Sequence, residues 1–66
     1  MKAYLLQAPR DFVEAGIPKG YMLQVISDRT SGPDFTEVRE ALKRAGFTST
    51  MAESFASPGN WIVREM

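Results

Sequence analysis

The fold of this chain is decided by residues 21–46, which read YMLQVISDRTSGPDFTEVREALKRAG. The first seven of these residues, 21–27, have the alternation of a β-strand, with largely apolar side chains on both of its faces. Such a strand is expected at the centre of a sheet, or covered on both sides. A loop rich in Asp, Ser, Gly and Pro follows at 28–33. The stretch then predicts a helix.

A capped amphipathic helix is predicted over residues 34–45. Asp34 and Glu37 have the spacing of a capping box, and Gly46 follows the last turn as a stop signal. Glu40 is expected to pair with Arg44 one turn further along. One stripe of the helix is apolar and would face the sheet. This stripe consists of Phe35, Val38, Ala41, Leu42 and Ala45.

Strands are predicted at both ends of the chain. Residues 1–8 contain a short apolar run that is closed by Pro9, which removes a backbone donor. Residues 60–66 follow a Ser-Pro-Gly turn, with Trp61 and Val63 expected on one face. Residues 10–16 are ambiguous, since they fit either a single helical turn or a second extended segment.

The segment between the helix and the last turn, 47–57, is too long for a structureless loop in a small domain. We expect apolar side chains to hold it against the core, or a short strand to form at 47–50. The side chains expected to do so are Phe47, Met51 and Phe55.

These elements predict a single small α+β domain over residues 1–66, with the order β-β-α-β. The sheet is expected to be mixed, with three strands or four, and with one helix on one face. The connection through the helix would be a right-handed crossover if its two strands are parallel. The first two strands are expected to form an antiparallel hairpin with a long connection.

One helix covers only one face of such a sheet, so the other face is predicted to need a cover from outside the chain. In the favoured register that face carries Tyr4, Leu6, Met22, Ile26 and Ile62. A slip of one residue would exchange the two faces of a strand. A homodimer would supply the cover, through face-to-face sheets or edge pairing. Met22, Ile26 and Ile62 are therefore the predicted interface, with another protein as an alternative partner.

Residues 17–65 resemble a group of short uncharacterised bacterial proteins with the order β-β-α-β. The resemblance is carried by a Lys-Gly turn, an apolar strand, a polar loop with proline and the helix stripe. The matching residues are Lys19, Gly20, 23–27, Pro33, Val38, Ala41 and Leu42. The resemblance implies the same fold and carries no activity with it.

The composition of the chain argues against several classes of protein. With 44% hydrophobic residues and zero net charge, the chain of 66 residues is expected to form a core rather than remain disordered. Zero net charge also argues against a dedicated nucleic-acid binder and against a polybasic membrane anchor. No apolar run approaches the roughly 20 residues that span a bilayer. The apolar run at the N-terminus is too short for a signal peptide, so a cytoplasmic location is expected.

The chain contains neither His nor Cys. Nucleophilic systems that depend on an imidazole, and zinc sites of the usual ligand types, are therefore excluded. Glu37 and Glu40 are helical neighbours, but they are predicted to be solvated rather than a catalytic pair. The chain is predicted to be no enzyme, with no cofactor and no metal. The leading hypothesis is a non-enzymatic module that self-associates or binds a protein.

Two alternative binding sites remain as hypotheses. An accessory nucleic-acid binder would use the basic surface of the helix, because phosphates attract clustered cations. Its contacts would be Arg39, Lys43 and Arg44. An anion could instead bind the loop at 28–34, before the helix N-terminus. Its contacts would be Arg29, Thr30 and Ser31. Asp28 and Asp34 oppose such a site by charge, and Pro33 offers no N–H.

Overall fold

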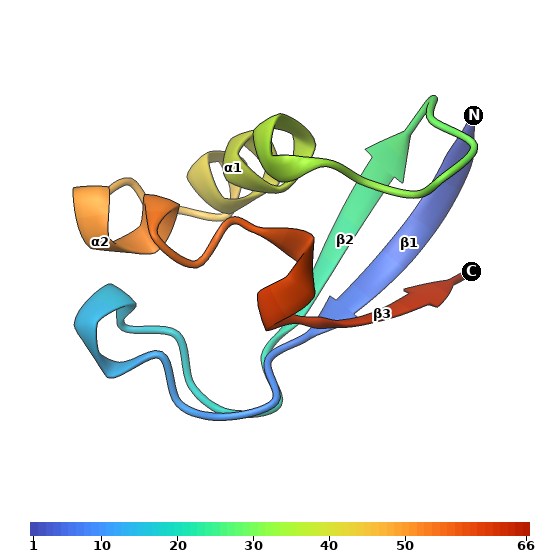
Figure 1. The fold of residues 1–66 in the computed structure, drawn as a ribbon. Helices are drawn as coiled ribbons and strands as arrows, with labels where there is room; N and C mark the ends of the chain where they lie inside the picture. Colours follow the sequence, from blue (N-terminus) through green and yellow to red (C-terminus); the bar gives the residue numbers. More distant parts are fainter.

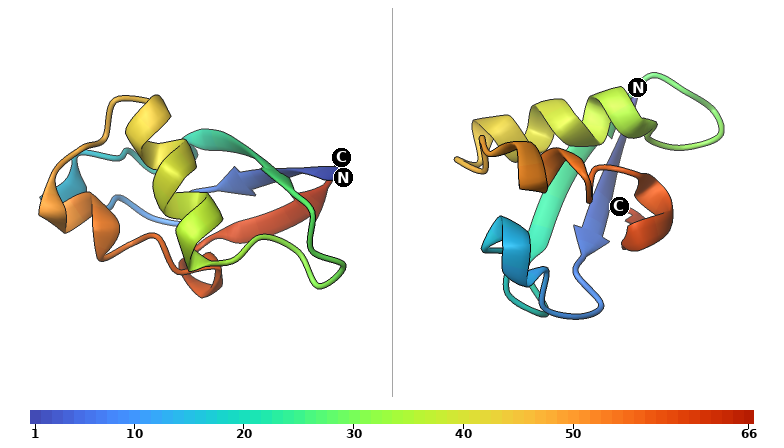
Figure 2. Two further views of the ribbon diagram at one scale, coloured as in Figure 1. Left: turned by 90° about the horizontal axis from the view of Figure 1, so that it is seen from above. Right: turned by 60° about the vertical axis from the view of Figure 1, so that its left-hand side comes forward.

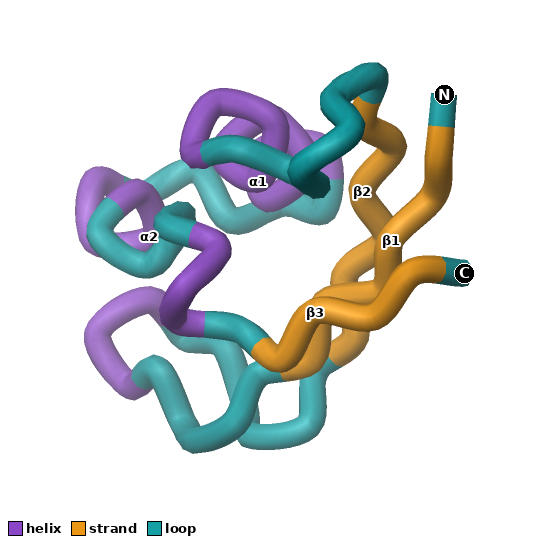
Figure 3. The backbone as a smooth tube through the Cα atoms, turned by 45° about the vertical axis from the view of Figure 1, so that its right-hand side comes forward, coloured by secondary structure: helices purple, strands orange, loops and turns teal.

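The computed structural model describes every residue from Met1 to Met66. Its helices all lie on one side of a three-stranded sheet (Figures 1 and 3). The elements, with η for a short 3₁₀ turn, are β1 (Lys2–Gln7), η1 (Val13–Ala15), β2 (Met22–Ser27), α1 (Phe35–Arg44), α2 (Thr50–Glu53), η2 (Pro58–Asn60) and β3 (Ile62–Glu65). The α+β class and the order of the main elements, β-β-α-β, are confirmed.

The sheet has the strand order β2-β1-β3, and both neighbouring pairs are antiparallel. Leu6 of β1 lies opposite Leu23 on one side and Val63 on the other. The sheet thus differs from the expected mixed sheet. β2 and β3 do run parallel, as a crossover through α1 requires, but β1 lies between them. β2 is consequently an edge strand, and the expectation that it lies at the centre was wrong.

α1 is held at both ends by the contacts that its sequence predicts. The Asp34 carboxylate accepts from the Glu37 backbone N–H, and the Glu37 side chain accepts from the Asp34 backbone N–H, which completes the capping box. At the other end Gly46 has φ +103°, where glycine carries no side-chain penalty. The Phe47 N–H then donates to the Leu42 carbonyl, as in a Schellman motif. The residues that α1 buries are Val38, Ala41 and Leu42.

Aromatic side chains close the core at the end of the sheet where η1 and α2 meet. The rings of Phe12 and Phe55 stack with centroids 4.4 Å apart, and Trp61 meets Phe12 edge-on at 5.3 Å. The Trp61 indole N–H donates to the Phe55 carbonyl at 2.6 Å, so the buried indole is satisfied. Arg10 lies over the Phe12 ring at 5.0 Å and covers the cluster on its outer side.

The segment after α1 differs from its prediction in two ways. The expected strand at 47–50 is absent, and the short helix α2 forms instead, because the Ser49 side chain caps the Ala52 N–H. Phe55 is buried as predicted, and Phe47 is half-buried against Tyr21. Met51 was expected in the core, but it points outward and is 43% exposed.

The ambiguous segment at 10–16 combines both of its alternatives. η1 supplies a single helical turn that ends at Gly16, whose φ is +74°. Phe12 and Ile17, on either side of it, form an isolated antiparallel bridge. The Asp11 carboxylate does not cap η1 but accepts the backbone N–H of Lys19 at 2.6 Å. Asp11 thus closes the long hairpin between β1 and β2.

Candidate interaction surface

The face of the sheet turned away from the helices has no element of the chain over it (Figures 2 and 3). Side chains alternate along each strand, and paired residues point to the same side of a sheet, so the strand register fixes which residues share this face. We call it the open face. Its residues are Ala3, Leu5, Gln7, Met22, Gln24, Ile26, Ile62 and Arg64.

The three predicted interface residues all lie on the open face. Ile26 is 55% exposed, Met22 is 50% exposed and Ile62 is 44% exposed. Leu5, at the centre of the face, is half-buried between its neighbours on β2 and β3. The open face is therefore a small apolar surface.

The open face is arranged in rows that run across the strands. The middle row is Gln24, Leu5 and Arg64. One outer row is Met22, Gln7 and Ile62, and the other begins with Ile26 and Ala3. In that last row the Met66 N–H donates to the Ala3 carbonyl at 2.8 Å. Apolar side chains thus occupy both outer strands, and each carries one polar side chain at mid-height.

Tyr4 and Leu6 were expected on the open face, and this was wrong. They lie on the helix side, 6% and 0% exposed, because they pair with Val25 and Leu23. The register therefore places even-numbered β1 residues opposite odd-numbered β2 residues. The open face receives Ala3, Leu5 and Gln7 from β1 instead.

The basic surface of α1 is only partly free. Arg39 pairs with Glu40 at 3.6 Å and Glu53 at 3.8 Å, and its guanidinium lies over the Phe35 ring. Lys43 and Arg44 are exposed and form no ion pair. The expected pair between Glu40 and Arg44 does not form, since Glu40 turns to Arg39 instead. The nucleic-acid contact stays a prediction for these three cations.

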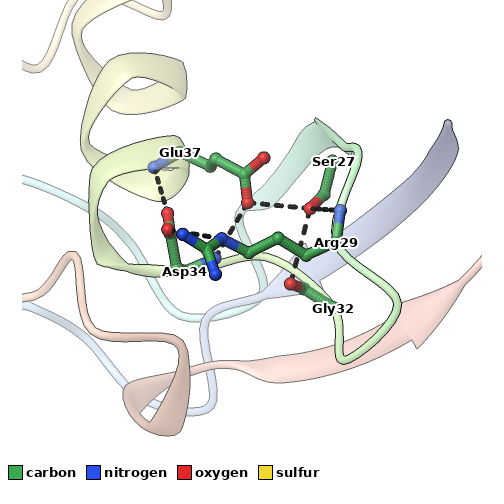
Figure 4. Close-up of polar contacts among 5 residues, drawn as sticks. All are labelled: Ser27, Arg29, Gly32, Asp34 and Glu37. Atoms are coloured by element: carbon green, nitrogen blue, oxygen red, sulfur yellow. Dashed lines mark hydrogen bonds and ion pairs between the residues drawn. The ribbon is translucent and has the colours of Figure 1, made fainter.

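The loop between β2 and α1 is organised by a polar network (Figure 4). Buried Ser27 donates from its hydroxyl to Glu37 Oε1 at 2.8 Å and accepts the Arg29 backbone N–H at 3.1 Å. Arg29 Nε in turn lies 2.7 Å from Asp34 Oδ2. The network ties the end of β2 to the first turn of α1.

This network bears on the predicted anion contacts. Thr30 and Ser31 are exposed, but Arg29 is already paired with Asp34. The carboxylates of Asp34 and Glu37 each accept a backbone N–H at the start of α1, and these two donors are then not available to an anion. The arrangement stabilises the loop and leaves the anion contact a prediction without support from the geometry.

Glu37 was expected to be solvated, and this was wrong, because Glu37 accepts from both Ser27 and Asp34. Glu40 points instead toward Arg39. The two carboxylates therefore belong to different contacts. The capping-box spacing is the one sequence signal for the structural role of Glu37, and no signal marks Ser27.

The pKa of the Asp34 carboxylate is shifted by its local contacts. The hydrogen bond from the Glu37 backbone N–H, aided by the charge of Arg29, lowers the pKa of Asp34 below its ordinary value of 3.8. The ionised form therefore stabilises the fold above that ordinary value. This stabilisation is lost as the pH falls through the lower pKa of the folded state.

Asp34→Asn tests this linkage. Asparagine keeps a capping oxygen but cannot ionise, so we expect a lower urea midpoint than wild type at about pH 7 and converging midpoints at a pH well below 3.8. The matched control is Asp28→Asn, since Asp28 is exposed and forms no ion pair. A gap between wild type and Asp34→Asn that is the same at both pH values would contradict the role given to Asp34.

The surface has no pocket, and no three carboxylates gather closely enough to hold a metal ion. None of the helices has the length and apolar character needed to cross a membrane. Comparisons of the chain with protein-family models, with curated proteins and with solved structures give no match. The resemblance to short bacterial proteins therefore stays a prediction.

Proposed function

We propose that this chain is a cytoplasmic, non-enzymatic module that acts by self-association through the open face. The observation that carries the proposal is the grouping of Met22, Ile26 and Ile62 on a sheet face with no helix over it. An exposed face that gathers apolar side chains is a feature of interaction sites. The alternative occupant is a different protein with a similar apolar surface.

The inventory of side chains supports a non-enzymatic role. The chain has no His or Cys to activate a nucleophile. Ser27 is a buried hydroxyl beside a carboxylate, but it is only 2% exposed and no substrate reaches it. Asp34 and Glu37 are occupied by the capping box and the loop network.

Charge and area together set the expected strength of the association. Zero net charge means that two copies meet without long-range repulsion. Three strands about 4.8 Å apart and five positions with a rise of about 3.4 Å give a flat patch of about 250 Å² per copy. Side-chain relief enlarges this area, but an interface at or below about 1,000 Å² in total is typical of a weak complex. We therefore expect a reversible dimer in the micromolar range.

Ile26→Lys tests the proposal by sedimentation velocity over a concentration series. Wild type is expected to shift from monomer to dimer as concentration rises, and Ile26→Lys to weaken the dimer at least about tenfold, because a desolvated ammonium is costly. Ile26 is exposed in the monomer, so the variant should keep the circular dichroism of a folded chain.

The matched control is Val13→Lys, which places the same charge at a 76% exposed position on η1, outside the sheet. Its dimerisation should equal that of wild type. A wild type that remains a 7.4 kDa monomer at millimolar concentration would falsify self-association. Equal dimerisation of wild type and Ile26→Lys would move the interface to a sheet edge and overturn the assignment to the open face.

A further inference from the structure

We propose that two copies of the chain pack their open faces together about a two-fold axis parallel to β1. In this arrangement Gln24 of each copy faces the partner's Arg64. The inference rests on the self-association proposed above and specifies its geometry. It comes from the way that apolar and polar side chains are distributed over the open face.

The strand order of the sheet leads to this geometry. β1 lies in the middle, with β2 and β3 on either side of it. A two-fold rotation about an axis along β1 keeps every row at its own height and exchanges the two outer strands. β2 of one copy therefore lies over β3 of the other, with β1 over β1. Sheets packed in this way keep their strands within about 30° of each other, as in β-sandwiches.

The rows of the open face complement one another under this rotation. Met22 meets the partner's Ile62 in one outer row, and Leu5 meets the partner's Leu5 at the centre. Gln24 meets the partner's Arg64 in the middle row, where the amide oxygen can accept from the guanidinium. An interface between identical copies requires such self-complementarity. The apolar side chains of these two rows are covered and the one charge on the face finds an acceptor.

A two-fold axis across the strands gives a poorer match. It would place each strand over its own copy, so that Arg64 meets the partner's Arg64 in the middle row. Two guanidinium groups would then face each other while losing water, and like charges at close range repel. Arg64 is the one charged residue of the open face, so it discriminates between the two axes.

The test changes the charge at position 24 in both directions. Gln24 is an exposed residue on an edge strand, so Gln24→Glu and Gln24→Lys should both fold. Within one chain β1 separates residues 24 and 64 by about 10 Å, so a new charge at 24 interacts little with its own Arg64. Dimer dissociation constants are measured by sedimentation equilibrium for wild type and both variants.

The proposed axis predicts opposite signs for the two variants. Gln24→Glu forms two symmetric ion pairs with the partner's Arg64 and should tighten the dimer about three- to tenfold. Gln24→Lys should weaken it by a similar factor, and both effects should shrink at high salt. The double variant Gln24→Glu with Arg64→Gln should lose the gain, because the cation is gone.

Any other pattern overturns the geometry. If both single variants weaken the dimer, position 24 faces its own copy and the axis runs across the strands. If neither variant changes the dissociation constant, the middle row lies outside the interface. These outcomes are distinct from a failure of self-association itself, which would appear as a monomeric wild type before any variant is compared.

Discussion

Phe12→Ala is expected to leave the chain largely unfolded at room temperature. Phe12 is fully buried and contacts both other rings of the aromatic cluster, Phe55 by stacking and Trp61 by its edge. Truncation of a buried phenyl ring costs about 3–5 kcal/mol, because the cavity left behind only partly collapses. A domain of this length has a total stability of about 3–10 kcal/mol. The loss is thus comparable with the whole free energy of unfolding.

Urea unfolding followed by far-UV circular dichroism measures this loss. The neighbouring Val13→Ala is the matched control, since Val13 is 76% exposed and its midpoint should stay within experimental error of wild type. Phe12→Leu refills part of the cavity and should fall between the two. A Phe12→Ala midpoint equal to that of Val13→Ala would show that the aromatic cluster adds little to the core.

Local contacts explain why α1 could be predicted closely. The capping box links residues three positions apart, and the Schellman motif at Gly46 links residues of a single turn. Neither depends on the rest of the chain. The apolar stripe was right at its centre and wrong at its ends, because Phe35 and Ala45 lie beyond the area that the sheet covers and are exposed.

The open face could be predicted in part. Alternation within one strand is local, so Met22 and Ile26 were correctly placed together, and Ile62 joins them across β1. The residues that β1 contributes to the open face were predicted wrongly, because the register between two strands depends on the hairpin that joins them. That hairpin reverses the chain at η1, and its ladder continues past β1 to Ala8, whose N–H donates to the Tyr21 carbonyl while its own carbonyl accepts from the Gly20 N–H. No pattern in the sequence shows how many residues such a hairpin consumes.

The strand order could not be predicted from the sequence either. Residues 1–8 begin the chain and are less apolar on one face than residues 21–27, yet β1 is central and β2 lies at the edge. The order follows from where α1 returns the chain, since β3 pairs with the free side of β1. The exposed second face of β2 is therefore not covered within the chain.

Glu37→Ala is the second change expected to have a large effect. It tests whether the loop before α1 stabilises the fold through its polar network or only links β2 to α1. One carboxylate oxygen accepts from the Ser27 hydroxyl at 2.8 Å and from the Asp34 backbone N–H at 3.0 Å. Alanine removes both bonds and leaves the buried Ser27 hydroxyl with only the longer contact to the Gly32 carbonyl, at 3.4 Å. Hydrogen bonds to a charged group contribute about 1.5–3 kcal/mol, so we expect a loss of about 2 kcal/mol.

Glu40→Ala is the matched control, three residues further along the same helix. Glu40 makes a single exposed pair with Arg39 at 3.6 Å, so its removal should change the free energy of unfolding by less than about 0.5 kcal/mol. Glu37→Gln keeps an acceptor oxygen and should recover part of the stability that Glu37→Ala loses. Urea unfolding gives the free energy of unfolding of the three variants.

Equal losses in Glu37→Ala and Glu40→Ala would mean that both carboxylates are solvated, as their spacing alone suggests. A selective loss in Glu37→Ala would show that the network holds the end of β2 against the first turn of α1.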